Sequence, residues 1–124
     1  MLAHEKFKAY QLSLDYIKIS FSLMNKIPRG HAAIKDQLKR ASLSIPLNIA
    51  EGTGKISKKE KDYFYSIARG SAMECAAICD VIKIMDKTSS VEVDEAKSLI
   101  HSIVSILSSV CFKKGWGIGT KGRR

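Results

Sequence analysis

The chain has little of what a membrane, secreted or disulfide-bonded protein needs. None of its apolar runs approaches the ~20 residues that a membrane-spanning helix requires. The opening residues, Met1 to Lys6, lack the apolar core of a secretory signal, so we expect a cytoplasmic protein. Three cysteines are an odd number, and their arrangement does not indicate a disulfide framework.

Acidic residues are also scarce. The chain has 12 Asp and Glu and 21 Lys and Arg, which gives a net charge of +9. Residues 113–124 alone hold Lys113, Lys114, Lys121, Arg123 and Arg124 and no acid. A positive surface attracts polyanions such as nucleic acid. A solvated basic surface without a partner is the alternative, and charge alone does not choose between the two.

Strand-like alternation is absent, and helical spacing fills most of the chain. We expect helices at 4–27, 31–50, 57–86 and 93–112. Pro28 and Gly30 end the first, Gly52 and Gly54 end the second, and Ser57 begins the third with a capping box. Four helices with short connections predict an all-α, antiparallel up-down-up-down four-helix bundle over residues 1–112. A flexible, basic, glycine-rich tail is expected at 113–124.

The first helix carries two apolar stripes, of which one bundle buries only one. The stripe assigned to the core is Phe7, Tyr10, Leu14, Ile17, Phe21 and Met24. The other stripe is Leu12, Tyr16, Ile19 and Leu23, and we expect it to form a homo-oligomer interface. We expect this stripe to contact small residues of a neighbouring subunit. They are Ser98, Ser102, Ser105, Ser108 and Ser109 on the fourth helix, and Ala68, Ala72, Ala76 and Cys79 on the third. A monomer with scattered surface apolar residues is the alternative.

The second helix carries a polar ridge beside its apolar stripe. Its members are Gln37, Arg40, Ser44, Asn48 and Glu51. Arg40 has Glu51 and Glu74 as candidate partners, and Pro46 should bend the helix. The ridge either fixes helix packing or lines a groove or pore.

Two segments of the chain resemble the signatures of a known family. Residues 37–52, with Ser44-Ile45-Pro46 followed by Asn48, and residues 67–74, from Ile67 to Glu74, are similar to those of the 23S rRNA-intervening-sequence proteins. The resemblance implies a left-handed four-helix bundle that assembles into a ring, typically a pentamer. It also implies kinship with the accessory variability determinant of diversity-generating retroelements, a basic ring that partners a reverse transcriptase and binds nucleic acid. Arg69 and Glu74 of the second segment complete the polar ridge.

Sites for enzymatic chemistry are not recognisable. Cys75 and Cys79 share a helix face, where buried structural thiols are a better interpretation than a metal site. The three histidines have no acid and nucleophile in a recognised pattern. We therefore expect no enzyme activity, metal or cofactor. A residual enzyme hypothesis would use the ridge residues Arg40, Asn48, Glu51, Arg69 and Glu74, provided that they converge in a pocket.

Basic residues cluster at the turn between the second and third helices. They are Lys55, Lys58, Lys59 and Lys61, and Lys35, Lys39 and Arg40 of the second helix are expected to extend the patch. Without interleaved aromatic residues, such a patch would bind RNA or DNA without sequence preference. The expected function is that of a nucleic-acid-binding accessory protein. The alternative is a protein-interaction scaffold, for example one that recruits a reverse transcriptase, with no nucleic-acid binding of its own.

Overall fold

The computed structural model describes residues 1–111, which form helices and no strands. The four long helices are α1 (Lys8–Lys26), α2 (Ala32–Thr53), α3 (Lys58–Met85) and α4 (Ser90–Cys111), with two short 3-10 helices, η1 (Ala3–Lys6) and η2 (Lys87–Ser89). The prediction of an all-α fold with four helices is confirmed, and the helix bounds agree with expectation to within a few residues. The basic tail at 113–124 lies outside the described residues.

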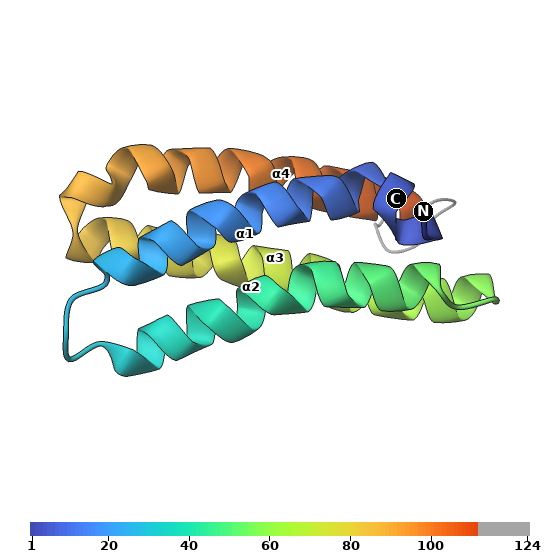
Figure 1. Ribbon diagram of the computed structural model, residues 1–124, viewed down its shortest axis with the longest axis horizontal. Helices are drawn as coiled ribbons and strands as arrows, with labels where there is room; N and C mark the ends of the chain where they lie inside the picture. Colours follow the sequence, from blue (N-terminus) through green and yellow to red (C-terminus); the bar gives the residue numbers. More distant parts are fainter. Residues whose placement is uncertain (112–124) are drawn as a thin grey trace, which may run out of the picture.

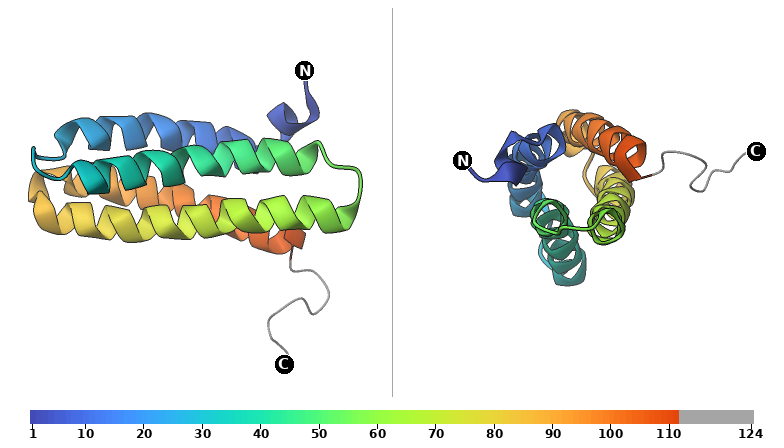
Figure 2. Two further views of the ribbon diagram at one scale, coloured as in Figure 1. Left: turned by 90° about the horizontal axis from the view of Figure 1, so that it is seen from below. Right: turned by 90° about the vertical axis from the view of Figure 1, so that its right-hand side faces the viewer.

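The four helices stand at the corners of a square when the bundle is seen from its end (Figure 2). α1 packs on α2 and α4, and α3 packs on the same two helices. Followed by colour in Figure 1, the chain runs along α1, back along α2, out again along α3 and back along α4. The N-terminus, the α2–α3 connection and the end of α4 therefore share one end of the bundle.

Local interactions fix where the helices begin and end. Gly30 adopts a positive φ of 94° in the α1–α2 connection, a conformation that favours glycine. Ser57 caps α3, because its Oγ accepts a hydrogen bond of 3.1 Å from the backbone N–H of Glu60. Asp86 ends α3, and its Oδ1 accepts from the N–H and the hydroxyl of Thr88. The expected cap at Ser57 is thus present.

The predicted orientation of α1 is wrong. Tyr16 and Leu23, expected at an oligomer interface with Leu12 and Ile19, are 0 % exposed in the core of the subunit itself. Leu12 and Ile19 are half-buried and pack against that core. The other buried side chains of α1 are Ala9, Ser13, Ser20 and Met24, and Ile27, directly after the helix, is buried too. Of these, Met24 was expected in the core. Small side chains at Ala9, Ser13 and Ser20 let the neighbouring helices approach α1 on this face.

The small residues of α3 show the same effect. Ala68, Ala72 and Cys79, which were expected to face a neighbouring subunit, are completely buried inside this one. Ile67 of the same helix is 36 % exposed. The apolar stripes of α2 and α4 also face the core. Their buried members are Leu38, Ala41, Ile45, Ile49, Ala96, Ile100, Ile103 and Leu107.

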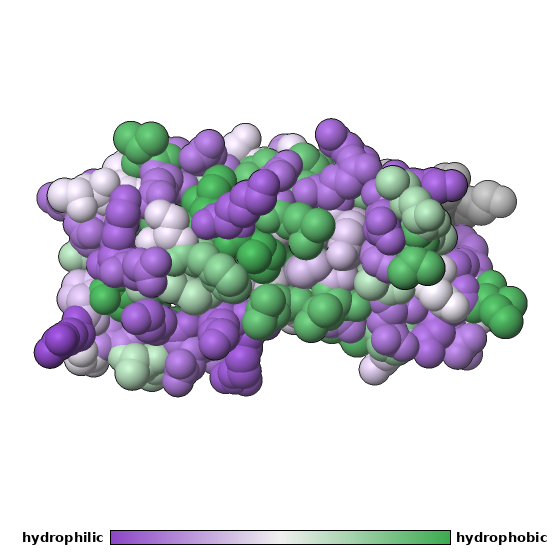
Figure 3. Space-filling model, viewed as in Figure 1, coloured by the Kyte–Doolittle hydropathy of each residue, from purple (hydrophilic) through white to green (hydrophobic). Residues whose placement is uncertain are grey.

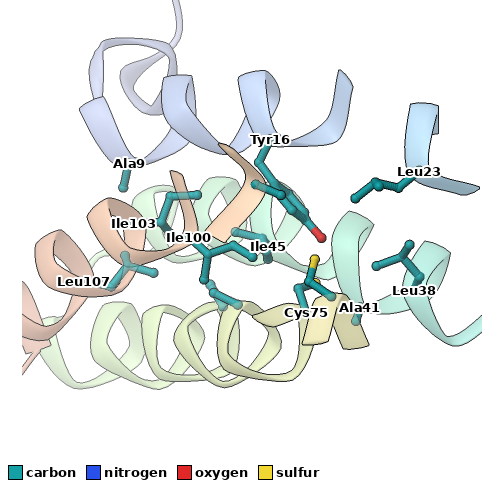
Figure 4. Packing of buried hydrophobic residues seen from close by; sticks show 14 of the residues in the cluster. Ala9, Tyr16, Leu23, Leu38, Ala41, Ile45, Cys75, Ile100, Ile103 and Leu107 are labelled. Carbon is teal, nitrogen blue, oxygen red and sulfur yellow. The ribbon is translucent and has the colours of Figure 1, made fainter. Parts of the chain in front are cut away.

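A polar cluster lies within this core, centred on Ser42 of α2. The Ser42 hydroxyl shares hydrogen bonds of 3.0 Å with the Tyr16 hydroxyl and 2.7 Å with the Ser20 hydroxyl. The Cys75 sulfur lies 3.7 Å from the Ser42 oxygen, and Figure 4 shows it pointing toward the Tyr16 hydroxyl. Each hydroxyl therefore has a partner, as buried polar groups require, and the cluster ties α1, α2 and α3 together.

Candidate nucleic-acid interface

The lysine turn (Lys55, Lys58, Lys59 and Lys61) is held by a close approach of α2 to α3. A Cβ at Gly52 would lie 2.9 Å from two ring atoms of Tyr65 and 3.1 Å from the carbonyl oxygen of Lys61. The Tyr65 hydroxyl shares a 2.8 Å hydrogen bond with Thr53 Oγ1. Because only a hydrogen fits at Gly52, the ring of Tyr65 packs directly on the backbone of α2 and fixes the geometry of the turn.

Two of the four lysines are bound to acids one helical turn away. Lys55 Nζ lies 3.1 Å from Glu51 Oε2 and 5.2 Å from the ring centre of Phe64. Lys58 Nζ lies 2.6 Å from Asp62 Oδ2. Such exposed pairs are weak, each worth roughly 0.2–1 kcal/mol, so a phosphate group can compete for either lysine.

The other two lysines differ in their roles. Lys61 Nζ donates a 2.9 Å hydrogen bond to the carbonyl oxygen of Thr53, so this lysine also closes the end of α2. Lys59 is exposed and makes no hydrogen bond or ion pair with another residue of the described 1–111 range. Among the four, Lys59 is therefore the side chain with its charge most available.

The three basic residues of α2 do not extend this turn. Lys35 and Lys39 line a hollow of about 350 Å³ together with Phe21, near the opposite end of the bundle. Lys35 precedes Lys55 by 20 residues, which is about 30 Å along a helix. Arg40 lies on the other side of α2 and donates a 2.9 Å hydrogen bond to Gln37 Oε1. The expectation of one continuous patch is wrong, because helix length separates its members.

The end of α4 lies beside the lysine turn. Cys111 Sγ is 3.9 Å from the carbonyl oxygen of Asp62, in the first turns of α3. The chain therefore leaves the described part of the bundle at the end that carries the lysine turn (Figures 1 and 2). Five basic residues follow in the sequence at 113–124.

One exposed aromatic side chain near the turn was missed by the sequence analysis. Tyr63 is 62 % exposed and lies four residues after Lys59, on the same face of α3. Its ring contacts that of Phe64 edge to face, with centroids 5.0 Å apart. The i, i+4 spacing of Lys59 and Tyr63 could have revealed this pair of a cation and an aromatic ring.

The polar ridge of α2 is linked to α3 by hydrogen bonds through Gln37. Gln37 donates from Nε2 to Glu74 Oε2, and its own Oε1 accepts the hydrogen bond from Arg40. Arg40 therefore reaches Glu74 only through Gln37, and Glu51 pairs with Lys55 instead. Neither of the two candidate partners of Arg40 binds it directly.

The rest of the ridge also spans helices. Asn48 donates to the carbonyl oxygen of Ser44 at 2.8 Å and to its hydroxyl at 2.9 Å. The Ser71 hydroxyl of α3 donates to Ser44 Oγ at 2.7 Å. Arg69 turns toward α4, where its Nε donates to Ser108 Oγ at 2.7 Å. The two signature segments, 37–52 and 67–74, thus meet across the α2–α3 contact.

The sequence profile of the 23S rRNA-intervening sequence proteins matches residues 5–109, which include all four helices almost to their ends. The chain belongs to this family. Neither a curated protein nor a solved structure matches it. The family resemblance noted in the two signature segments is therefore confirmed, and those segments form the α2–α3 contact of this 23S rRNA-intervening sequence protein.

The five ridge residues considered for an enzyme do not converge in this family member. Asn48 is hydrogen-bonded to Ser44 within α2, and Glu51 forms an ion pair with Lys55 of the lysine turn. Arg69 is hydrogen-bonded to Ser108 of α4. Within residues 1–111, no three His, Cys, Asp or Glu side chains are grouped so that they could hold a metal ion. The same residues include no helix with the length and hydrophobicity to cross a membrane.

Burial governs the chemistry of the three thiols. Burial raises the pKa of Cys79 to about 12 and that of Cys111 to about 11, and it also raises the pKa of Cys75. A thiol is nucleophilic as its thiolate, so all three are held in their unreactive form at neutral pH.

An apolar surface remains on α1 because its orientation differs from the expected one. The outer stripe, which we define as Tyr10, Leu14, Ile17 and Phe21, was expected in the core, and of these four Tyr10 does pack against it. Leu14 is instead 42 % and Phe21 43 % exposed. Figure 3 shows apolar side chains gathered along the middle of the face presented by α1 and α2. The candidate surface for assembly is thus the stripe opposite to the one predicted.

Proposed function

We propose that this protein is a non-catalytic, cytoplasmic accessory factor that binds RNA or DNA without sequence preference as a homo-oligomer of antiparallel four-helix bundles. The observation that carries the proposal is the lysine turn at one end of the bundle, where Lys59 has no partner among residues 1–111 and Lys55 and Lys58 are held by weak ion pairs. The lysine turn and the end of α4 lie together there, as the contact of Cys111 with Asp62 indicates.

The contacts at this end suit a phosphate backbone more than a base sequence. Lysines bind phosphates as point charges, and none of the described contacts presents a fork of donors aimed at a base edge. Tyr63 adds a ring on which any base can stack, a contact that favours single strands. In a ring of five or so subunits, weak phosphate contacts repeat and add through multivalency.

Assembly is supported by the outer stripe of α1. Its apolar side chains have the alternating spacing of four and three that suits packing against another helix. This stripe also favours the second candidate function, a scaffold that recruits a protein partner and binds no nucleic acid. The two candidates differ in one measurable respect, the affinity for nucleic acid at moderate salt.

The experiment is a salt titration of binding to a single-stranded RNA. The double variant Lys58→Ala/Lys59→Ala should bind more weakly and lower the slope of log K against log salt by about 0.7 for each phosphate that it no longer neutralises. Lys61 is left in place because its bond to Thr53 is structural. The matched control is Lys35→Ala/Lys39→Ala, which removes the same charge at the other end of the bundle and should leave the slope nearly unchanged.

Tyr63→Ala provides a contrast within the same assay. Removal of a stacking platform should weaken binding to single strands by about 1–3 kcal/mol while the salt slope stays the same. If the lysine-turn variant and its control change the slope equally, the turn is not the site. If the wild-type protein binds neither RNA nor DNA at moderate salt, the scaffold function replaces the proposed one.

A further inference from the structure

Two apolar surfaces of the subunit lie on opposite sides of α2. The first is the outer stripe of α1, on the side where α1 and α2 enclose the hollow beside Phe21. The second lies between α2 and α3, where a hollow of about 360 Å³ is lined by Ala33, Ile34, Gln37, Ile78 and Val81. We call this second surface the α2–α3 groove.

The face of α3 that leads to Val81 of this groove is open to an approaching helix. Ile67, Gly70, Glu74 and Val81 follow one another on one face of α3, at steps of three, four and seven residues. Ile67 is 36 % and Val81 42 % exposed, and a Cβ built on Gly70 would meet no atom within 4 Å. The face therefore combines exposed aliphatic side chains with a position where the backbone itself is accessible.

The charges beside the two surfaces are complementary. Lys18 flanks the outer stripe, is exposed, and forms no ion pair with another residue of the described chain. Glu74 is exposed and accepts from the neutral amide of Gln37, and none of the ion pairs among residues 1–111 includes it. Each subunit thus presents an unpaired cation, Lys18, beside the first surface and an unpaired anion, Glu74, beside the second, while Lys35, Asp36 and Lys39 also line the hollow beside Phe21.

We propose that the outer stripe of α1 in one copy of this chain docks into the α2–α3 groove of a second copy, with Lys18 of the first copy paired to Glu74 of the second. This inference rests on the homo-oligomer in the proposed function and names its contact. A head-to-tail contact of this kind covers both apolar surfaces of every internal copy. A symmetric contact between two outer stripes would leave every α2–α3 groove uncovered.

The residue spacing is consistent with a single register. If Leu14 lies over Gly70 and the two helices run in the same direction, Lys18 and Glu74 each lie four residues further on, about 6 Å along either helix. Leu14 then occupies the space that the missing side chain of Gly70 leaves open. In the same alignment Phe21, seven residues after Leu14, lies over Ala77, next to Ile78 at the edge of the α2–α3 groove.

Charge reversal tests the pairing directly. Lys18→Glu and Glu74→Lys should each weaken association about ten-fold or more at low salt, because each places like charges together. The double variant Lys18→Glu/Glu74→Lys restores an opposite pair across the contact and should associate within about three-fold of the wild type. Light scattering over a dilution series measures the association, and circular dichroism checks that each variant is folded.

Two further variants separate charge from shape. Lys8→Glu/Glu95→Lys reverses two exposed charges off both surfaces and should leave association unchanged. Gly70→Met fills the open position on α3 without changing charge and should weaken association about ten-fold or more. A Gly70→Met protein that assembles like the wild type would contradict the proposed register.

The outcomes distinguish this inference from the proposed function. If the wild type is an oligomer but the double reversal is no better than the single variants, this contact is wrong while assembly stands. If both single variants assemble like the wild type, the contact is also wrong. A wild-type protein that is monomeric at all concentrations would overturn the proposed assembly itself.

Discussion

Replacing Gly52 by alanine tests how the lysine turn is built. The added methyl group would lie 2.9 Å from Cδ1 and Cε1 of Tyr65 and 3.1 Å from the backbone oxygen of Lys61. The ring cannot retreat freely, because its hydroxyl is bonded to Thr53 and the ring of Phe7 lies 5.6 Å from it, centroid to centroid. We therefore expect a cost in the upper part of the range for overpacking, about 2–3 kcal/mol.

A gain in helix propensity offsets part of this cost. Alanine is favoured over glycine in a helix by about 1 kcal/mol, so Gly52→Ala should lower the free energy of unfolding by about 1–2 kcal/mol. Urea unfolding followed by circular dichroism measures the difference. Gly54→Ala is the matched control, because its Cβ would lie at ordinary contact distances of 3.5 and 3.6 Å. The control should stay within about 0.5 kcal/mol of the wild type. A Gly52→Ala protein as stable as the control would refute the close approach at Tyr65.

Two further predictions concern the core. The thiols of Cys75, Cys79 and Cys111 should react slowly with Ellman's reagent near neutral pH and fully after unfolding; fast reaction of the folded protein would contradict their burial. Because the folded pKa values of Cys79 and Cys111, about 12 and about 11, lie above an unfolded value of about 8.5, the stability they contribute is complete below pH ~8.5 and is lost as pH rises toward those values. Urea titrations should show a loss of up to about 1.4 kcal/mol per pH unit for each thiol, and a flat profile would exclude this linkage. Ser42→Ala removes the partner of the buried Tyr16 hydroxyl and should cost about 1–3 kcal/mol in the same assay; an unchanged stability would show that this hydroxyl finds another partner.

The helices were predictable from the sequence, but the orientation of α1 was not. Its spacing offered two equivalent stripes, and counting large apolar residues chose the wrong one. Ser13 and Ser20 count as polar in such a pattern, yet both are buried. The Ser13 hydroxyl donates to the carbonyl oxygen of Tyr10 at 2.6 Å, and the Ser20 hydroxyl binds Ser42. A serine whose hydroxyl is satisfied nearby behaves as a small residue that permits close packing, which periodicity alone does not reveal.

The candidate site was predictable where its contacts are local. The pairs Glu51–Lys55 and Lys58–Asp62 have the i, i+4 spacing that ion pairs on a helix require, and both are present. The link from Gln37 to Glu74 depends instead on the register of α2 against α3. That register is fixed by packing at positions such as Gly52, which lie far from the link in the sequence.

The most direct test of the account is the mass of the wild-type protein by light scattering after size-exclusion chromatography, at low and at high salt. The ultraviolet absorbance ratio of the same peak reports any nucleic acid that it carries. We expect an oligomer that persists at high salt, because its contact is largely apolar, and that carries nucleic acid only at low salt. A monomer that carries no nucleic acid at either salt concentration would contradict it.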